Sequence, residues 1–330
     1  MSDSTLLITS IIAAIIPTII YIAIIYWFDR YEKEPWWLLV AAFLWGAIPS
    51  IIVAFIFNTI LSIPVYLLAG EGIADALSAS LIAPPVEETV KGLALLMILL
   101  IWRHEIDSPL DGIIYGAMVG MGFAMVENVY YFVNVFNEAG TEAWSINIFM
   151  RGVIFGLNHA LFTSMTGLGI GIARMSTNGL VKFGAPILGW MMAMFLHFLH
   201  NAAVSTGTLL CFLALIFDWG GVLLTLAIIL WAVLQERQWL KIYLAEEVHL
   251  GTMTLKQYEI ACSGRQRTRH SLDVLVSQGF DKYRKTRGFY HRCSELAYTK
   301  HHFSRFQDAK HQERLLNLRQ HIADNSLLVI

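Results

Sequence analysis

Two adjacent glutamates, followed within one helical turn by a lysine, occur in a chain that is otherwise strongly apolar. Glu87, Glu88 and Lys91 follow Pro84-Pro85 in an apolar stretch. On a helix Lys91 lies three and four residues from the two acids, so its ammonium can neutralise one carboxylate. The other carboxylate would remain in a low-dielectric site, where a general base or acid can be made. A structural ion triad that fixes helix packing explains the same three residues equally well.

Three later apolar stretches also contain polar or ionisable side chains. A charge in the middle of a membrane costs at least about 2.5–3.5 kcal/mol, so each of these residues needs a reason. Residues 151, 155, 159 and 163 advance by fours, which predicts one shared helix face. The residues are, in chain order, Glu127 and Asn128; Arg151, Phe155, Asn158, His159 and Thr163; and His197, His200 and Asn201.

Carboxylates, imidazoles and a side-chain amide together fit peptide hydrolysis by activated water. Glu87 or Glu88 would take a proton from the water, and His159 would orient it. His197 and Asn201 would donate to the tetrahedral oxyanion. The sequence contains no Gly-x-Ser-x-Gly elbow, no His-Glu-x-x-His motif and no cysteine near this set.

The composition requires a membrane protein. Of 330 residues 56% are hydrophobic and 15% charged, with a mean hydropathy of +0.58. These values exclude disordered, collagen-like and disulfide-stapled chains. A spanning helix needs about 20 mostly apolar residues. An all-α polytopic fold with seven transmembrane helices is therefore predicted, at 5–27, 37–62, 74–102, 109–135, 147–171, 184–206 and 219–235. The segment 207–217 is also apolar and allows an eighth span, and Asp218-Trp-Gly-Gly221 predicts a break between it and the last helix.

Charge is distributed unevenly along the chain, which predicts its orientation and its domains. Residues 1–235 contain 7 Lys/Arg and 15 Asp/Glu, whereas residues 236–330 contain 16 and 10. With seven spans and the N-terminus outside, every basic loop lies in the cytoplasm. We expect a protease-like transmembrane core over 1–235 and a basic, polar, mostly helical cytoplasmic tail over 236–330.

The tail has a capping box at Thr254-Leu-Lys-Gln257 and a helix-prone stretch over 271–319. Its charge is mixed in sign, so no nucleic acid is expected.

The order of these motifs resembles the PrsW family of glutamic-type intramembrane proteases, relatives of the CAAX protease and bacteriocin-processing superfamily. The resemblance covers about residues 20–205. The matching segments are Glu87-Glu88-Thr-Val-Lys91, Phe123 to Glu127-Asn128, Phe155-x-x-x-His159 and His197-x-x-x-Asn201, with Asp29 to Trp37 before them.

The resemblance implies a membrane-embedded, metal-independent endopeptidase that needs no cofactor and acts on membrane-protein substrates in the lipid bilayer. Some members are similar to site-1 proteases that cleave anti-sigma factors, and the implied location is the bacterial cytoplasmic membrane. Glu87 would be the water-activating base and Glu88 its partner. His159 would support the water, and His197 with Asn201 would form the oxyanion pocket. The implied supporting residues are Lys91, Glu127, Asn128 and Phe155.

Two other classes of function remain open from the residues themselves. Buried Glu, Lys and His also build the proton relays of transporters and channels. A membrane sensor or scaffold that acts through the basic tail is the other class. A zinc enzyme that uses His197-x-x-His200 with a glutamate is a minor variant of the hydrolase. The substrate, its cleavage site, the activating signal and the oligomeric state are not encoded in any pattern.

Overall fold

The computed structural model describes residues 3–205, 208–307, 309–327 and 329, and among these residues it contains helices and no strand. This confirms the all-α class. The described chain divides into two compact units, one of Met1–Phe28 with Glu34–Ile229, the other of Asp29–Lys33 with Leu230–Ile330. The assignment of a protease-like core and a tail to particular ranges stays a prediction.

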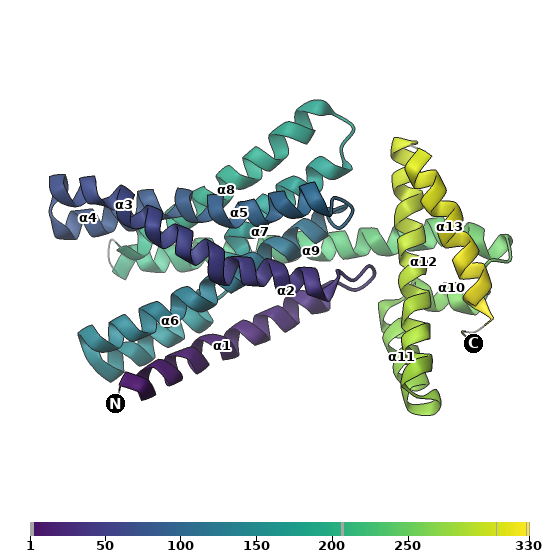
Figure 1. Ribbon diagram of the computed structural model, residues 1–330, viewed down its shortest axis with the longest axis horizontal. Coiled ribbons are helices and arrows are strands. Elements are labelled where there is room, and N and C mark those ends of the chain that lie inside the picture. The colour runs from purple at the N-terminus through teal and green to yellow at the C-terminus, as the bar shows by residue number, and fades with distance from the viewer. Residues whose placement is uncertain (1–2, 206–207, 308, 328, 330) are drawn as a thin grey trace. The chain divides into compact units, whose positions relative to one another are not determined.

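The first unit contains a helix in each predicted apolar stretch (Figure 1). Five segments are long and apolar enough to cross a membrane: Asp3–Phe28, Trp36–Ala69, Pro109–Met175, Gly179–Ser205 and Leu210–His249. The chain is therefore a helical membrane protein, and the number of crossings stays a prediction. In order, the helices are α1 (Asp3–Phe28), α2 (Trp36–Trp45), α3 (Ile51–Ala69), α4 (Glu71–Leu77), α5 (Ala83–Ile101), α6 (Pro109–Phe149), α7 (Asn158–Met175), α8 (Gly179–Ser205) and α9 (Thr208–His249).

Three short π-helical segments interrupt this bundle: η1 (Gly46–Ser50), η2 (Ser78–Ile82) and η3 (Met150–Ile154). Such segments widen a helix locally and are frequent at functional sites. The segment η2 leads directly into α5, whose first turn contains Pro84-Pro85. Within α6, Gly140 has a φ of 78° and turns the chain.

The shared face predicted for residues 151, 155, 159 and 163 is wrong. The helix stops after η3, and Phe155 has non-helical angles of φ −107° and ψ 11°. A new helix, α7, begins at Asn158. Only His159 and Thr163 therefore share an α7 face, while Arg151 belongs to the preceding segment.

The predicted break at 218–221 is also wrong. The helix α9 continues from Thr208 through this stretch to His249, so 207–217 and 219–235 belong to one helix as far as the structure describes them. The Asp218 carboxylate accepts hydrogen bonds from Asn158 Nδ2 at 2.9 Å and from His200 Nδ1 at 2.7 Å. These two partners satisfy the buried carboxylate of Asp218. The glycines that follow it do not prevent the backbone hydrogen bonds of a helix, so nothing at 218–221 requires α9 to end.

Glycines bring α6 and α7 into backbone contact. A Cβ on Gly112 would lie 2.0 Å from the Gly167 carbonyl oxygen. A Cβ on Gly120 would lie 2.1 Å from the His159 carbonyl oxygen. A larger residue at these positions would collide with the backbone of α7. The close approach therefore fixes the position of His159, in the first turn of α7, relative to α6.

The second unit contains α10 (Leu255–Ala261), α11 (Gly264–Gln278), α12 (Phe280–Phe306), α13 (Ala309–Ser326) and residues 230–249 of α9. The capping box predicted at Thr254 and Gln257 is present at the start of α10. The core includes Leu240, Leu244, Phe289 and Cys293. Burial raises the pKa of the Cys293 thiol to about 12, so this cysteine stays protonated and is no nucleophile.

We predict that Gly112→Ala destabilises the protein by about 1–3 kcal/mol, because the added methyl group overpacks the α6–α7 contact. The measurement is the unfolding temperature of the purified protein in detergent. Gly184→Ala on α8 is the matched control, since a Cβ there meets nothing within 4 Å. Equal unfolding temperatures for the two variants would contradict the proposed contact.

Candidate active site

Lys91 is the centre of a buried polar network inside the first unit. Its side chain is fully buried, and its Nζ lies 2.8 Å from Glu88 Oε1 and 3.4 Å from Glu87 Oε2. The same nitrogen lies 3.0 Å from His159 Nδ1 and 3.8 Å from the centroid of the Phe123 ring. One cation therefore connects α5, α6 and α7.

The two adjacent glutamates have different surroundings. Glu88 accepts a hydrogen bond from Thr163 Oγ1 at 2.9 Å, lies 3.0 Å from His197 Nδ1, and has the shorter contact with Lys91. Every oxygen of Glu88 is thus held by a close partner. Glu87 has only longer contacts, from Asn58 Nδ2 at 3.3 Å and Lys91 at 3.4 Å, with His197 Nε2 at 3.9 Å.

His159 is oriented by partners on both ring nitrogens. Its Nε2 lies 2.8 Å from Glu127 Oε2, and its Nδ1 faces the ammonium of Lys91. Because a charged ammonium only donates, Nδ1 must accept and the ring proton belongs on Nε2, where it is donated to Glu127. Glu127 also pairs with Arg151 at 2.5 Å, and Arg151 Nε donates to Asn128 Oδ1 at 2.9 Å.

The structure thus brings together most of the residues selected from the sequence. The connected network comprises Glu87, Glu88, Lys91, Glu127, Asn128, Arg151, His159, Thr163 and His197.

Four of the selected residues, Phe155, Asn158, His200 and Asn201, have other contacts. Asn201 Nδ2 donates to the carbonyl oxygen of Ala79 in η2 at 2.8 Å. The ring of Phe155 packs edge-on against His200, with centroids 4.9 Å apart. His200 in turn pairs with Asp218, away from the network. The oxyanion role predicted for Asn201 stays a prediction, and its amide supports the segment that precedes Glu87.

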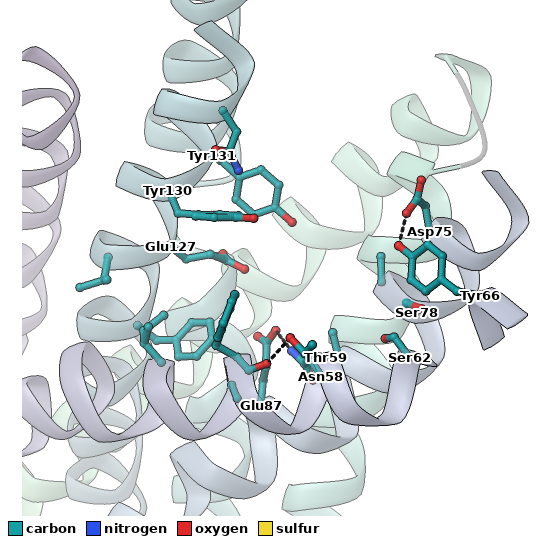
Figure 2. A pocket seen from close by; sticks show the side chains of 18 of the residues that line it. Asn58, Thr59, Ser62, Tyr66, Asp75, Ser78, Glu87, Glu127, Tyr130 and Tyr131 are labelled. Carbon is teal, nitrogen blue, oxygen red and sulfur yellow. Dashed lines mark hydrogen bonds between the residues drawn. The ribbon is translucent and has the colours of Figure 1, made fainter. Parts of the chain in front are cut away.

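Glu87 also lines a cleft of about 1010 Å³ between α3, α4 and η2 on one side and α6 on the other, which we call the α3–α6 cleft (Figure 2). Glu127, Tyr130 and Tyr131 line its α6 side, and Asn58, Ser62, Tyr66 and Asp75 line its α3–α4 side. Asn58 was not among the residues selected from the sequence, although it is the only side-chain amide in the apolar stretch 51–69, which was a usable signal.

Three residues of the network have the donor chemistry of a metal site. One ligand atom each from Glu87, His159 and His197 lies within 4.8 Å of the others. Two imidazoles and a carboxylate suit a catalytic zinc ion. The other ring nitrogen of His159 contacts Glu127, and the other ring nitrogen of His197 contacts Glu88, as is usual for histidines that bind a metal. The set therefore fits a metal in kind. Lys91 lies among the same atoms, so its ammonium and a metal ion would compete for His159 Nδ1 and Glu87.

The metal alternative deduced from the sequence combined the wrong pair of histidines. Within the described ranges, the group that could hold an ion contains His159 and His197. His200, which was paired with His197 in that alternative, contacts Asp218 instead. A three-residue spacing turns the two side chains to different sides of α8.

A helical membrane protein with a buried glutamate–histidine cluster beside a cleft belongs to the class of candidate intramembrane hydrolases. The family model of "PrsW family intramembrane metalloprotease" matches residues 34–234, which is more than half of the chain. The chain therefore belongs to the PrsW family, and the resemblance deduced from its motifs is confirmed.

Curated relatives support the same family. "Protease PrsW" of Clostridioides difficile (strain 630) is 36% identical over 155 residues, which is 47% of this chain and 61% of the relative. The corresponding protein of Geobacillus kaustophilus (strain HTA426) is 32% identical over 167 residues, 50% of this chain and 66% of the relative. "Protease PrsW" of Bacillus subtilis (strain 168) is 29% identical over 168 residues, 50% and 69%. The chain thus matches somewhat less than two thirds of the first two relatives, and no solved structure matches it.

We predict that Lys91→Met destabilises the protein by about 3–5 kcal/mol, because it leaves two buried carboxylates without their shared cation. Adding Glu88→Gln to Lys91→Met should recover part of this loss, since one buried charge is then removed. Unfolding temperatures in detergent measure both effects, and Lys182→Met at an exposed position is the control. If Lys91→Met matched this control, the network would not depend on its central cation.

Proposed function

We propose that this protein is an intramembrane endopeptidase that hydrolyses peptide bonds of membrane-protein substrates with water activated by Glu87. The observation that carries the proposal is the position of Glu87, which lines the α3–α6 cleft and also belongs to the buried network. Family membership supports the same activity, which is that of the named relatives. A site-1-type cleavage of an anti-sigma factor is the finer proposal.

Charge balance supports Glu87 as the base. The network contains three carboxylates, Glu87, Glu88 and Glu127, but only two permanent cations, Lys91 and Arg151. Glu88 and Glu127 have the shorter contacts with these cations, so Glu87 is left as the under-compensated acid. When Glu87 takes a proton from water, its excess negative charge is neutralised. Proton uptake at Glu87 is therefore favourable, as a general base requires.

The reaction then follows from the position of Glu87. Glu87 Oε2 and His197 Nε2 lie 3.9 Å apart, a separation at which both atoms can contact one water molecule. Glu87 removes a proton as the water oxygen attacks the substrate carbonyl carbon. The proton then passes from Glu87 to the amide nitrogen as the C–N bond breaks. Glu88 holds His197 and Lys91 in place during this cycle.

The remaining selected residues support this centre in our proposal. Asn128 accepts a hydrogen bond from Arg151, and Arg151 holds Glu127, which orients His159. Phe155 packs beside the start of α7 against His200. The substrate reaches Glu87 from within the bilayer through the α3–α6 cleft. The orientation that we propose, with the N-terminus outside a bacterial cytoplasmic membrane, follows from the distribution of Lys and Arg.

We predict that Glu87→Gln lowers cleavage by at least about 10²-fold, because the amide cannot accept a proton from water. The measurement is mass spectrometry of new membrane-protein termini in cells that produce either the wild type or the variant. Glu142→Gln, which changes an exposed glutamate at the end of the bundle, is the matched control. Equal cleavage by purified Glu87→Gln and wild-type protein would refute the mechanism.

A metal-dependent hydrolase is the second candidate, favoured by the family description and by the donor set of Glu87, His159 and His197. A bound zinc ion would supply Lewis-acid activation of water at this site. The chain's own residues would hold the ion, and Glu88 and Glu127 would fix the tautomers of the two histidines.

Metal analysis separates the two candidates. The glutamate mechanism predicts that a chelator leaves activity unchanged and that the purified protein holds far less than one zinc ion per chain. One ion per chain, lost together with activity in His159→Ala, would establish the metal mechanism instead. Elemental analysis of wild type and His159→Ala gives this answer independently of the activity assay.

A further inference from the structure

The α3–α4 side of the α3–α6 cleft carries a row of polar side chains among apolar ones such as Phe55 and Ile63. The helix α3 has 19 residues, and its four polar side chains all line the cleft: Asn58, Thr59, Ser62 and Tyr66. Ser78 of η2 and Asp75 of α4 continue the same wall (Figure 2). Polar residues inside a membrane helix are costly, so a continuous row of them beside a cleft needs a ligand or a partner.

Two oxygens of this wall lack any partner in the described chain. Asn58 Nδ2 donates to Glu87 Oε1, which leaves Asn58 Oδ1 buried and without a hydrogen bond. Ser78 Oγ is also buried and without a hydrogen bond. An unsatisfied buried polar atom is unfavourable. Both residues line the cleft, so a rotation of each side chain would let Asn58 Oδ1 accept from a main-chain N–H of a bound chain and Ser78 Oγ bond to its N–H or C=O.

The far end of this wall is anionic. Asp75 lines the cleft there and is exposed, with one carboxylate oxygen bonded by the Tyr66 hydroxyl. Glu138 lines the α6 side, and no Lys or Arg lines the cleft among the described residues. An occupant of complementary charge therefore carries a cation at the Asp75 end.

We propose that this wall, comprising Asn58, Ser62, Tyr66, Asp75 and Ser78, is a docking track for an unwound substrate segment. The segment lies along α3 from Glu87 to Asp75, and its main chain bonds to Asn58 and Ser78. Asp75 selects a Lys or Arg side chain. This inference rests on the proposed protease activity and names its substrate class, a membrane protein with a basic residue a few positions from the cleaved bond.

The geometry also gives the position of the basic residue. Asn58, beside Glu87, and Tyr66, beside Asp75, are eight residues apart on one helix, or about 12 Å at 1.5 Å per residue. An extended chain covers about 3.3 Å per residue. The selected Lys or Arg therefore lies about four residues from the scissile bond.

The test uses a single-span membrane protein as reporter, with ten randomised residues on either side of its apolar helix, in proteoliposomes. Cleavage products identified by mass spectrometry should be enriched in Lys or Arg about four residues from the cut. Asp75→Asn should remove this enrichment and lower kcat/KM for the basic reporter about fivefold, the effect of one exposed ion pair. Glu71→Gln is the matched control, because Glu71 lies on the same short helix but does not line the cleft.

Crosslinking tests docking without catalysis. In Glu87→Gln protein, Ser62→Cys should form a disulfide with reporter cysteines placed within four residues of the mapped cut. Ile60→Cys, on an exposed position of α3 outside the cleft, should not. Absence of the Lys/Arg enrichment, or equal crosslinking at both positions, would overturn the docking track and leave the proposed activity standing. Crosslinking at Ser62→Cys with no cleavage by the wild type would instead overturn the proposed activity and leave docking supported.

Discussion

The polar network inside the first unit depends on one buried ammonium group, that of Lys91, which several side chains contact at once. Lys91 contacts both glutamates of its own helix and His159 of another, and it lies over the ring of Phe123. In a membrane interior such a charge is tolerable only with several partners. Three carboxylates share two permanent cations in this network, so one carboxylate lacks a cation of its own. That imbalance distinguishes Glu87 from Glu88 more clearly than their adjacent positions in the sequence do.

Backbone packing fixes where these partners meet. The carbonyl oxygen of His159 lies where a Cβ on Gly120 would be, so α6 and α7 approach as closely as two backbones can. The unwound residues 155–157 then allow α7 to begin at Asn158 and point His159 toward Glu127 and Lys91. Small residues and a broken helix thus perform one task, which is to bring imidazole and carboxylate groups from separate helices together.

In the proposed reaction water and substrate need access to this centre, and the α3–α6 cleft is the route that we propose for them. The cleft borders Glu87 and extends along the polar face of α3, while the opposite face of that helix is apolar. Hydrolysis of a peptide bond within a membrane requires the substrate's own main-chain hydrogen bonds to be replaced. A wall with unsatisfied acceptor and donor groups suits that requirement, because a helix entering it can exchange internal bonds for bonds to the protein.

The sequence by itself determined the membrane class, the all-α fold and the family, because hydropathy and motif order are local properties of the chain. It also identified Glu87, Glu88, His159 and His197, since ionisable residues are conspicuous in apolar stretches. Only the tertiary structure separated the surroundings of Glu87 and Glu88, because their partners come from α3, α7 and α8. It alone showed that α9 continues past Asp218 and that the chain unwinds before Asn158. Both outcomes depend on which buried groups satisfy one another across helices, and spacing along one chain does not contain that information.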